Sequence, residues 1–132
     1  MRFAGYAAIF DRPDRGGDIV RRGAFATARA AATPVLWQHD AGQAIGWVES
    51  LAEDANGLRV IAEVRGDCAA AITPGAGLSF GYRVRASEQG KYRELKQVEL
   101  IEISLVTSPM QPLARVLAVE GAAGTVASGT VP

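Results

Sequence analysis

Two alternating apolar segments joined by a short turn place the strongest constraint on how this chain folds. Residues 58–64 alternate strictly between apolar and polar faces, with Leu58, Val60, Ala62 and Val64 on the apolar one. Residues 44–51 form a second apolar run, and the linking sequence Glu53-Asp54-Ala55-Asn56-Gly57 ends in Asn-Gly, whose two residues both tolerate a positive φ. The sequence therefore predicts an antiparallel β-hairpin in the middle of the chain.

Most of the remaining chain has the same strand-like character. Further strands are expected at residues 2–10, 35–38, 77–85 and 113–119, and residues 92–107 are too long for one flat strand, which predicts a bend near Lys96 and Gln97. Helical segments are short: the alanine-rich residues 24–32, and one or two turns at 67–72. About seven strands with one or two peripheral helices predict a mostly β (α+β) fold, a small antiparallel barrel or sandwich.

Length and composition predict one globular domain. The chain has 132 residues, of which 48% are apolar and 21% are charged, enough to bury one core but not two. From Gly121 onward the chain holds only small or apolar residues and proline, with no charged side chain. We therefore expect a domain over residues 1–118 and a flexible C-terminal tail over 119–132.

The charge balance and the cysteine count exclude several function classes. Fourteen basic side chains balance fourteen acidic ones, which argues against nucleic acid or an anionic membrane as a partner. The single Cys68 excludes an internal disulfide and a multi-cysteine metal site, and with one histidine a zinc site would have to use carboxylates. There is no run long enough to span a bilayer and no signal-peptide layout. We expect no metal, no cofactor and a reducing cytoplasm.

The only histidine, His39, ends the apolar run at residues 34–38, and some forty residues later Ser79 lies inside the strand-like sequence Leu78-Ser79-Phe80-Gly81-Tyr82. A serine hydroxyl becomes a nucleophile when a neighbouring base takes its proton, and imidazole is the usual base near neutral pH. If His39 and Ser79 meet in the fold, the chain has the pair that a serine hydrolase needs. Spacing alone does not show that they meet.

Glu102 is the best candidate for a third member that orients the imidazole. It lies in an otherwise apolar strand, where a charge is costly unless it is paired. A bond from the imidazole N–H would supply a partner and fix the tautomer. An arginine such as Arg83 or Arg93 would satisfy the carboxylate equally well, and spacing does not decide between them. Weaker candidates for the same role are Asp40 and Glu99.

Other residues have structural explanations beside their functional ones. Cys68 is a rival nucleophile, but no basic neighbour activates it. Ser104 is a rival serine whose apolar surroundings favour packing. Gly81, two residues after Ser79, would admit a substrate close to the backbone, or it would simply bend the strand.

The order of motifs then resembles a known family, the tailed-phage prohead (capsid-maturation) serine proteases. The resemblance covers residues 3–116. It rests on these segments, in the family's order: Asp18-Ile19-Val20, Arg22-Gly23-Ala24-Phe25, Leu36-Trp37-Gln38-His39-Asp40, Ile45-Gly46, Gly57-Leu58, Leu78-Ser79-Phe80-Gly81-Tyr82, and Glu102-Ile103-Ser104-Leu105-Val106-Thr107 with Pro109 and Pro112. Each motif alone is weak, whereas six or seven in this order are specific.

The resemblance implies a fold, a reaction and site residues. The family is distantly similar to the herpesvirus assemblin proteases, which implies a closed barrel of about seven strands ringed by helices. Carried over by motif, Ser79 is the nucleophile and His39 the general base, and Glu102 stands where assemblins carry a second histidine. Residues 66–77 are shorter than the family's usual insert, and residues 109–112 differ from its usual Pro-Ala-Asn-Pro. The loop after Thr107 is where we expect the oxyanion-hole N–H groups.

Two functions follow from these expectations. The leading hypothesis is a serine endopeptidase that cuts scaffold, or the scaffolding segment of the major capsid protein, inside an assembling procapsid in the bacterial cytoplasm, and that also cuts itself. Its source would be a phage, a prophage or a domesticated particle such as a gene transfer agent. Dimeric assemblins imply a homo-oligomer by analogy, although no sequence stripe predicts the interface. The alternative is a non-catalytic assembly or scaffold-binding protein of the same fold.

Overall fold

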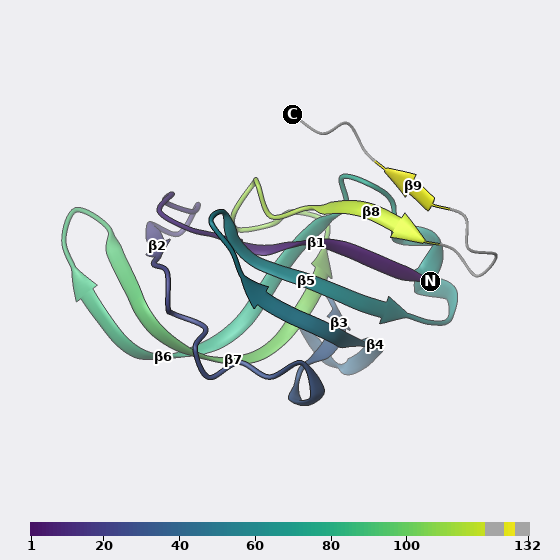
Figure 1. The fold of residues 1–132 in the computed structure, drawn as a ribbon, viewed down its shortest axis with the longest axis horizontal. Coiled ribbons are helices and arrows are strands. Elements are labelled where there is room, and N and C mark those ends of the chain that lie inside the picture. The colour runs from purple at the N-terminus through teal and green to yellow at the C-terminus, as the bar shows by residue number, and fades with distance from the viewer. Residues whose placement is uncertain (121–125, 129–132) are drawn as a thin grey trace.

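The computed structural model describes residues 1–120 and 126–128, which form one β-sheet of nine strands with two short 3-10 helices (Figure 1). The strands are β1 (Arg2–Ile9), β2 (Asp18–Val20), β3 (Pro34–Trp37), β4 (Asp40–Glu53), β5 (Gly57–Val64), β6 (Gly77–Gln89), β7 (Arg93–Val106), β8 (Val116–Glu120) and β9 (Val126–Ser128). The helices are η1 (Ala30–Ala32) and η2 (Asp67–Ala71). The predicted mostly β fold is therefore confirmed, with two short strands, β2 and β9, that the sequence analysis did not foresee.

Strand β7 organises the sheet because it pairs with three other strands. β6 runs antiparallel along its whole length, from Gly77 opposite Val106 to Gln89 opposite Arg93. The other edge of β7 is shared by two strands that run parallel to it, β2 near its start and β3 near its end. Figure 1 shows β6 and β7 as a long curved hairpin that extends beyond the rest of the sheet. The elements of the functional site described below all meet on β7.

The strand pairings follow an open path. The order is β2-β7-β3-β4-β5-β1-β8-β9, with β6 on β7. Where β6 approaches β8, the described residues show one isolated bridge, Gly77 with Arg115, and three backbone bonds, from Leu78 N–H to Ala114 O, from Val116 N–H to Ala76 O and from Gly75 N–H to Val116 O. The expected closure into a barrel is therefore not confirmed.

The predicted central hairpin is present, but its turn is not built as the sequence suggested. β4 and β5 pair from Gly46 with Val64 to Glu53 with Leu58. Neither Asn56 nor Gly57 has a positive φ. Instead, the Asp54 carboxylate accepts bonds from the backbone N–H groups of both residues, at 2.8 and 3.2 Å. Gly57 is required for another reason, since a Cβ there would lie 1.9 Å from the Ala8 carbonyl oxygen on β1.

The helix expected over residues 24–32 is wrong: this segment forms turns and only the single turn η1. Ala24 and Phe25 are buried in the core, and Phe25 packs edge-on against Phe80 with ring centroids 5.2 Å apart. The backbone N–H groups of Gly23 and Phe25 donate to the Glu53 carboxylate at 2.7 and 2.9 Å. Alanine propensity is too weak to form so short a helix when core packing and a carboxylate hold the segment otherwise. The short turn expected at 67–72 corresponds to η2.

The bend expected in the long strand is also present. Ser87 pairs with Leu95 and Ala86 with Gln97, so Lys96 lies opposite no residue, and the register shifts there. The shift marks the point where the ladder changes its course. On either side of it, Leu95, Val98, Ile103 and Leu105 of β7 are buried in the core with residues of β1 and β5.

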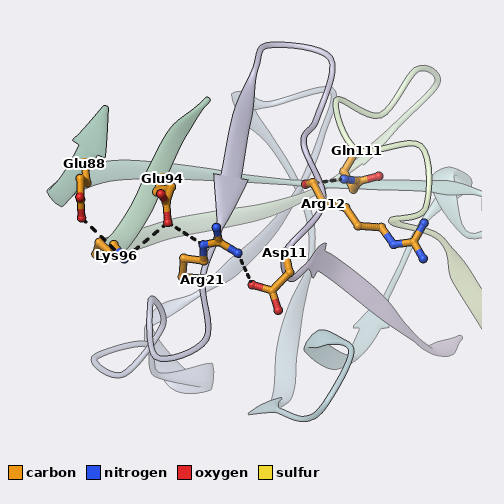
Figure 2. Close-up of polar contacts among 7 residues, drawn as sticks. All are labelled: Asp11, Arg12, Arg21, Glu88, Glu94, Lys96 and Gln111. Carbon is orange, nitrogen blue, oxygen red and sulfur yellow. Dashed lines mark hydrogen bonds and ion pairs between the residues drawn. The ribbon is translucent and has the colours of Figure 1, made fainter. Parts of the chain in front are cut away.

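Ion pairs of Arg21, directly after β2, connect the loop before β2 to β7. The Arg21 guanidinium bonds Glu94 at 2.7 Å and Asp11 at 2.8 Å, and Lys96 approaches Glu94 at 3.5 Å and Glu88 at 3.9 Å (Figure 2). The two carboxylates raise the pKa of Arg21 above its ordinary value. Arg21 therefore links Asp11, in the loop before β2, to Glu94 on β7.

Two expectations fall at the edge of what the structure describes. Of the tail predicted over 119–132, Val119 and Glu120 belong to β8 and residues 126–128 form β9, and the other residues lie outside the described ones. The side chain of Cys68 also lies outside them. In the described part of the chain, no helix is long and apolar enough to cross a membrane.

Asp18 holds β2 against β7 and gives a testable pH dependence. Arg93 donates to both of its carboxylate oxygens at 2.8 Å, and these bonds hold the pKa of Asp18 below its ordinary value of 3.8. Because the pKa is lower in the folded chain, the stabilisation is complete above the unfolded value and is lost as the pH falls through the folded value. We expect Asp18→Asn to reduce the free energy of unfolding at neutral pH by about 1 kcal/mol, a modest value because Arg93 is half exposed.

Urea unfolding at neutral pH and near pH 3 measures this effect, and the difference between wild type and Asp18→Asn should narrow in acid. Glu88→Gln is the matched control. Glu88 is exposed and its distance of 3.9 Å from Lys96 makes a weak ion pair, so its replacement should have little effect at either pH. An equal loss for Asp18→Asn at both pH values would contradict the ion-pair explanation.

Candidate active site

His39 lies at the tip of a two-residue hairpin between β3 and β4. Trp37 pairs with Asp40, so Gln38 and His39 form the whole turn, and their φ angles are +52° and +61°. Positive φ at both central residues is the geometry of a type I′ turn, which matches the twist of the flanking strands. Residues other than glycine adopt it uncommonly, so the surroundings must hold this turn in place.

Hydrogen bonds to β7 and to Thr107, the residue after it, keep this turn in place. The Gln38 backbone N–H donates to the Leu105 carbonyl oxygen at 2.9 Å. The Gln38 side chain bonds Thr107 twice: Nε2 donates to Oγ1 at 3.1 Å, and Oε1 accepts from the backbone N–H at 3.0 Å. The backbone N–H of His39 donates to Ser104 Oγ at 3.1 Å. The histidine therefore starts from a backbone position that is fixed against β7.

The structure brings Glu102 and His39 together. Glu102 Oε1 lies 2.5 Å from His39 Nδ1, and Ser104 Oγ donates to Glu102 Oε2 at 2.5 Å. The Glu102 side chain is 7% exposed, whereas that of His39 is 44% exposed. Because a carboxylate only accepts hydrogen bonds, Nδ1 carries a proton, and Nε2 is left to accept one on the exposed side of the ring.

The other partners considered for the carboxylate and the imidazole are engaged elsewhere. Arg93 pairs with Asp18, and the nearest acidic group to Arg83 is Glu99, at 3.9 Å. Glu99 also pairs with Arg85. Asp40 accepts a bond from the backbone N–H of Gly42 at 2.8 Å. The geometry thus decides between alternatives that the spacing had left open.

Gly81 makes room for the Glu102 carboxylate. The two residues pair across β6 and β7, and a Cβ at position 81 would lie 2.2 Å from Glu102 Oε1. Any larger residue would therefore displace the carboxylate from His39. The glycine is needed by a side chain of the neighbouring strand, which is a different reason from the two that the sequence suggested.

Ser79 lies on β6 opposite Ser104 and two residues before Gly81, so it shares a face of the ladder with the Glu102 carboxylate. Ser79 and His39 line the same cavity of about 180 Å³. Ser104, the rival serine, is fully buried and lies outside that lining. The structure therefore presents Ser79, and not Ser104, at the cavity that the imidazole borders.

Polar residues from β2 and β6 close the far side of this cavity. Asp18 and Tyr82 both line it, and the Tyr82 hydroxyl donates to Asp18 Oδ2 at 3.2 Å. Burial and the adjacent Asp18 carboxylate raise the pKa of Tyr82. The tyrosine therefore stays neutral and remains a hydrogen-bond donor at neutral pH.

The loop after β7 forms another wall. Met110 and Gln111 line the cavity, and Gln111 Nε2 donates to the Arg12 carbonyl oxygen at 3.4 Å (Figure 2). The backbone N–H of Arg15 donates to the Met110 carbonyl oxygen at 2.9 Å. Two loops that are distant in the sequence thus brace each other beside Ser79.

A second hollow of about 480 Å³ opens on the other side of His39. Its apolar lining includes Leu36, Ala44 and the exposed Ile101, and His39 and Tyr82 border both hollows. The imidazole therefore borders a second, larger hollow besides the one that Ser79 lines.

The sequence singles out His39, Ser79 and Glu102 but not the residues that hold them. It suggests only packing for Ser104, and it does not indicate the contacts between Gln38 and Thr107. One signal was available: in the strand sequence Glu102-Ile103-Ser104, alternation places the carboxylate and the hydroxyl on the same face.

The chain is similar to phage proteases in sequence and to a viral protease in fold. Residues 1–127 match the family described as caudovirus prohead serine protease. The prohead protease of Enterobacteria phage HK97 is 31% identical over 138 residues, which cover 92% of this chain and 61% of that protein. The KSHV protease, in its crystal structure with a hexapeptide phosphonate inhibitor, superposes with a TM-score of 0.54 and 9% identity, covering 88% of this chain and 63% of that chain. The chain thus spans less than two thirds of the length of either protein.

Gly81→Ala should disrupt the site without replacing His39, Ser79 or Glu102. The added methyl group would push the Glu102 carboxylate from its place, so we expect the bond to His39 Nδ1 to break and stability to fall by about 1–3 kcal/mol. Because His39 is the only histidine, its Nδ1 proton gives a single low-field resonance in the ¹H NMR spectrum, and that resonance should be lost.

Gly90→Ala is the matched control, since a Cβ there would meet nothing closer than the Tyr92 carbonyl oxygen at 3.7 Å. A normal His39 resonance in Gly81→Ala would show that the carboxylate tolerates a side chain at this position.

Proposed function

Because this chain belongs to the caudovirus prohead serine protease family, we propose that it is a serine endopeptidase in which Ser79, His39 and Glu102 form the catalytic triad. The observation that carries the proposal is the bond between His39 Nδ1 and Glu102 Oε1, at the border of the cavity that Ser79 lines. The three groups come from three different strands or turns, and each takes the role that its chemistry allows.

Ser79 acts as the nucleophile and His39 as the general base. The Ser79 hydroxyl oxygen attacks the scissile carbonyl carbon while its proton passes to His39 Nε2, the ring nitrogen that Glu102 leaves free. The imidazolium then gives this proton to the leaving amine, and an acyl-enzyme remains on Ser79. A water molecule, activated by the same nitrogen, hydrolyses the acyl-enzyme and restores the serine.

Glu102 orients the imidazole and stabilises the imidazolium. Its carboxylate holds the proton on Nδ1, so the ring keeps the tautomer in which Nε2 accepts a proton. Since the side chain is almost fully buried, its attraction for the positive ring is screened far less than it would be in water.

We assign the oxyanion-hole donors to the loop after Thr107. Met110 and Gln111 of this loop line the cavity of Ser79, and backbone N–H groups that face the nucleophile are the usual donors to a developing oxyanion. The bonds from Arg15 and Gln111 that brace the loop would keep such donors in place as the charge develops.

We further propose the biological setting from family membership. The substrates are scaffold, or the scaffolding segment of the major capsid protein, and cleavage occurs inside the procapsid in the bacterial cytoplasm, for a phage, a prophage or a gene transfer agent. Residues 1–118 carry the protease domain, residues 119–132 follow it as a tail, and the protein also cuts itself. The domain forms a homo-oligomer, and the Gly77–Arg115 bridge supports a barrel that closes between β6 and β8.

Removing the nucleophile gives the first test of this function. When the chain is co-expressed with the major capsid protein of the same genome, we expect wild type to shorten the precursor and Ser79→Ala to leave it intact. Mass spectrometry of the capsid protein maps the cut. Ser87→Ala, at an exposed serine in the outer part of β6, is the matched control and should cut normally. Identical fragments from wild type and Ser79→Ala would overturn the protease assignment and favour a non-catalytic assembly protein.

Glu102→Gln tests the role of the third member. The amide keeps the shape but lacks the charge, and it can donate as well as accept, so the ring loses its fixed tautomer. We expect the cleavage rate to fall by about 10²-fold to 10⁴-fold, while His39→Ala should lose at least as much. The rate of precursor cleavage in a purified mixture measures both. A full rate for Glu102→Gln would show that Glu102 has only a structural role.

A further inference from the structure

Three polar side chains are buried among the described residues: Thr33, Glu102 and Ser104. Thr33 bonds the Arg29 carbonyl oxygen in a local turn. The other two bond each other beneath the site, and Ser104 is 0% exposed. A serine in that position cannot touch a substrate, so any role it has must act through its neighbours.

The Ser104 hydroxyl contacts both parts of the apparatus that carries the imidazole. It donates its only proton to Glu102 Oε2 at 2.5 Å, and it accepts the backbone N–H of His39 at 3.1 Å. One oxygen atom thus links the carboxylate that orients the ring to the backbone from which the ring projects.

No group on the β6 side holds the carboxylate. Residue 81 is a glycine, so the strand facing Glu102 has no side chain there that could bond the carboxylate, which fills the space above the glycine. With Oε1 bonded to His39, the rotation of the carboxylate is set by what holds Oε2, and that group is Ser104. Without the hydroxyl, Oε2 would lose this hydrogen bond while it remains buried, which is costly. The carboxylate would then tend to rotate until Oε2 reaches water.

The same hydroxyl also stabilises an unfavourable backbone. His39 has a φ of +61°, which a residue with a side chain adopts uncommonly, and its N–H points at Ser104. Loss of this acceptor would therefore loosen the turn and the carboxylate together.

We propose that Ser104 is a positioning residue that locks Glu102 and the His39 turn into one arrangement before substrate binds. The proposal deepens the triad assignment and rests on it. The hydroxyl forms no bond with substrate and undergoes no chemistry. Its contribution is to keep Nε2 of His39 directed at the cavity of Ser79.

Diisopropyl fluorophosphate tests this role without knowledge of the substrate. The reagent forms a bond between phosphorus and Ser79 Oγ and releases fluoride, while the serine proton passes to His39, so its rate reports how well the base is placed. We expect Ser104→Ala to slow labelling of Ser79 by about 10-fold to 100-fold, the range found when partners that orient metal-binding histidines are removed. Intact-mass spectrometry over time measures the rate, and Ser87→Ala should label as wild type does.

A double-mutant cycle separates positioning from simple structural support. If Ser104 acts through Glu102, Ser104→Ala should slow labelling in the wild-type background but add little in Glu102→Gln. Additive losses would overturn the proposal. If Ser104→Ala does not fold, Ser104→Cys, which keeps the size but donates weakly, replaces it in the same cycle.

A second readout needs no enzymatic activity. In Ser104→Ala the low-field Nδ1 resonance of His39 should broaden or shift, because the carboxylate that holds this proton has lost its own anchor. If labelling and the resonance are both unchanged while Ser79→Ala abolishes labelling, the role of Ser104 is wrong and the protease function stands. If wild type is not labelled and Ser79→Ala cuts the capsid protein normally, the protease function is wrong, and the resonance still decides whether Ser104 holds the pair.

Discussion

The buried carboxylate of Glu102 is the feature on which the rest of the site depends. A charged group removed from water is costly unless hydrogen bonds replace its hydration, so its position requires partners. His39 and Ser104 provide one bond to each oxygen, and Gly81 provides the space that the carboxylate occupies. Four residues on two strands and one turn are thus determined by a single requirement, and a change in any of them alters the others.

The register of the strands paired with β7 brings the partners of the Glu102 carboxylate to it. β3 pairs with β7 only from Ile103 to Leu105, so β3 ends at Trp37. The next two residues, Gln38 and His39, then form their turn beside the Glu102 carboxylate. On the opposite edge, β6 places Ser79 and Gly81 beside Ser104 and Glu102. Because side chains alternate along a strand, a slip of one residue in either ladder would turn half of these groups to the wrong face. Burial of Leu105 and its neighbours in the core fixes that register.

Local patterns predicted the elements well and their contacts poorly. Alternation located most of the strands, and residue types and their settings singled out His39, Ser79 and Glu102 before the order of the motifs added a family. Whether Glu102 meets a histidine or an arginine depends on which strands become neighbours, and spacing along one chain does not contain that information. Turn rules also misled: Asn56 and Gly57 lack the positive φ angles that their types suggest, while Gln38 and His39 have them. The energy for the unfavourable turn comes from bonds to β7, so only the tertiary structure could reveal it.

Two carboxylates with different partners lie at or near the cavity beside Ser79: Asp18 lines it, and Glu102 is bonded to His39, which lines it. Asp18 is paired with the guanidinium of Arg93, whose charge is permanent, so this pair remains neutral as a whole throughout a reaction. Glu102 is bonded to His39, whose imidazole lines the cavity. When the imidazole takes up a proton, the negative charge of Glu102 is therefore available to stabilise the new positive charge. The charge of Asp18 is already neutralised by Arg93. In the proposed triad, the exposure of the two side chains, 44% for His39 and 7% for Glu102, would let the ring reach substrate while its stabilising partner stays in a medium of low dielectric constant.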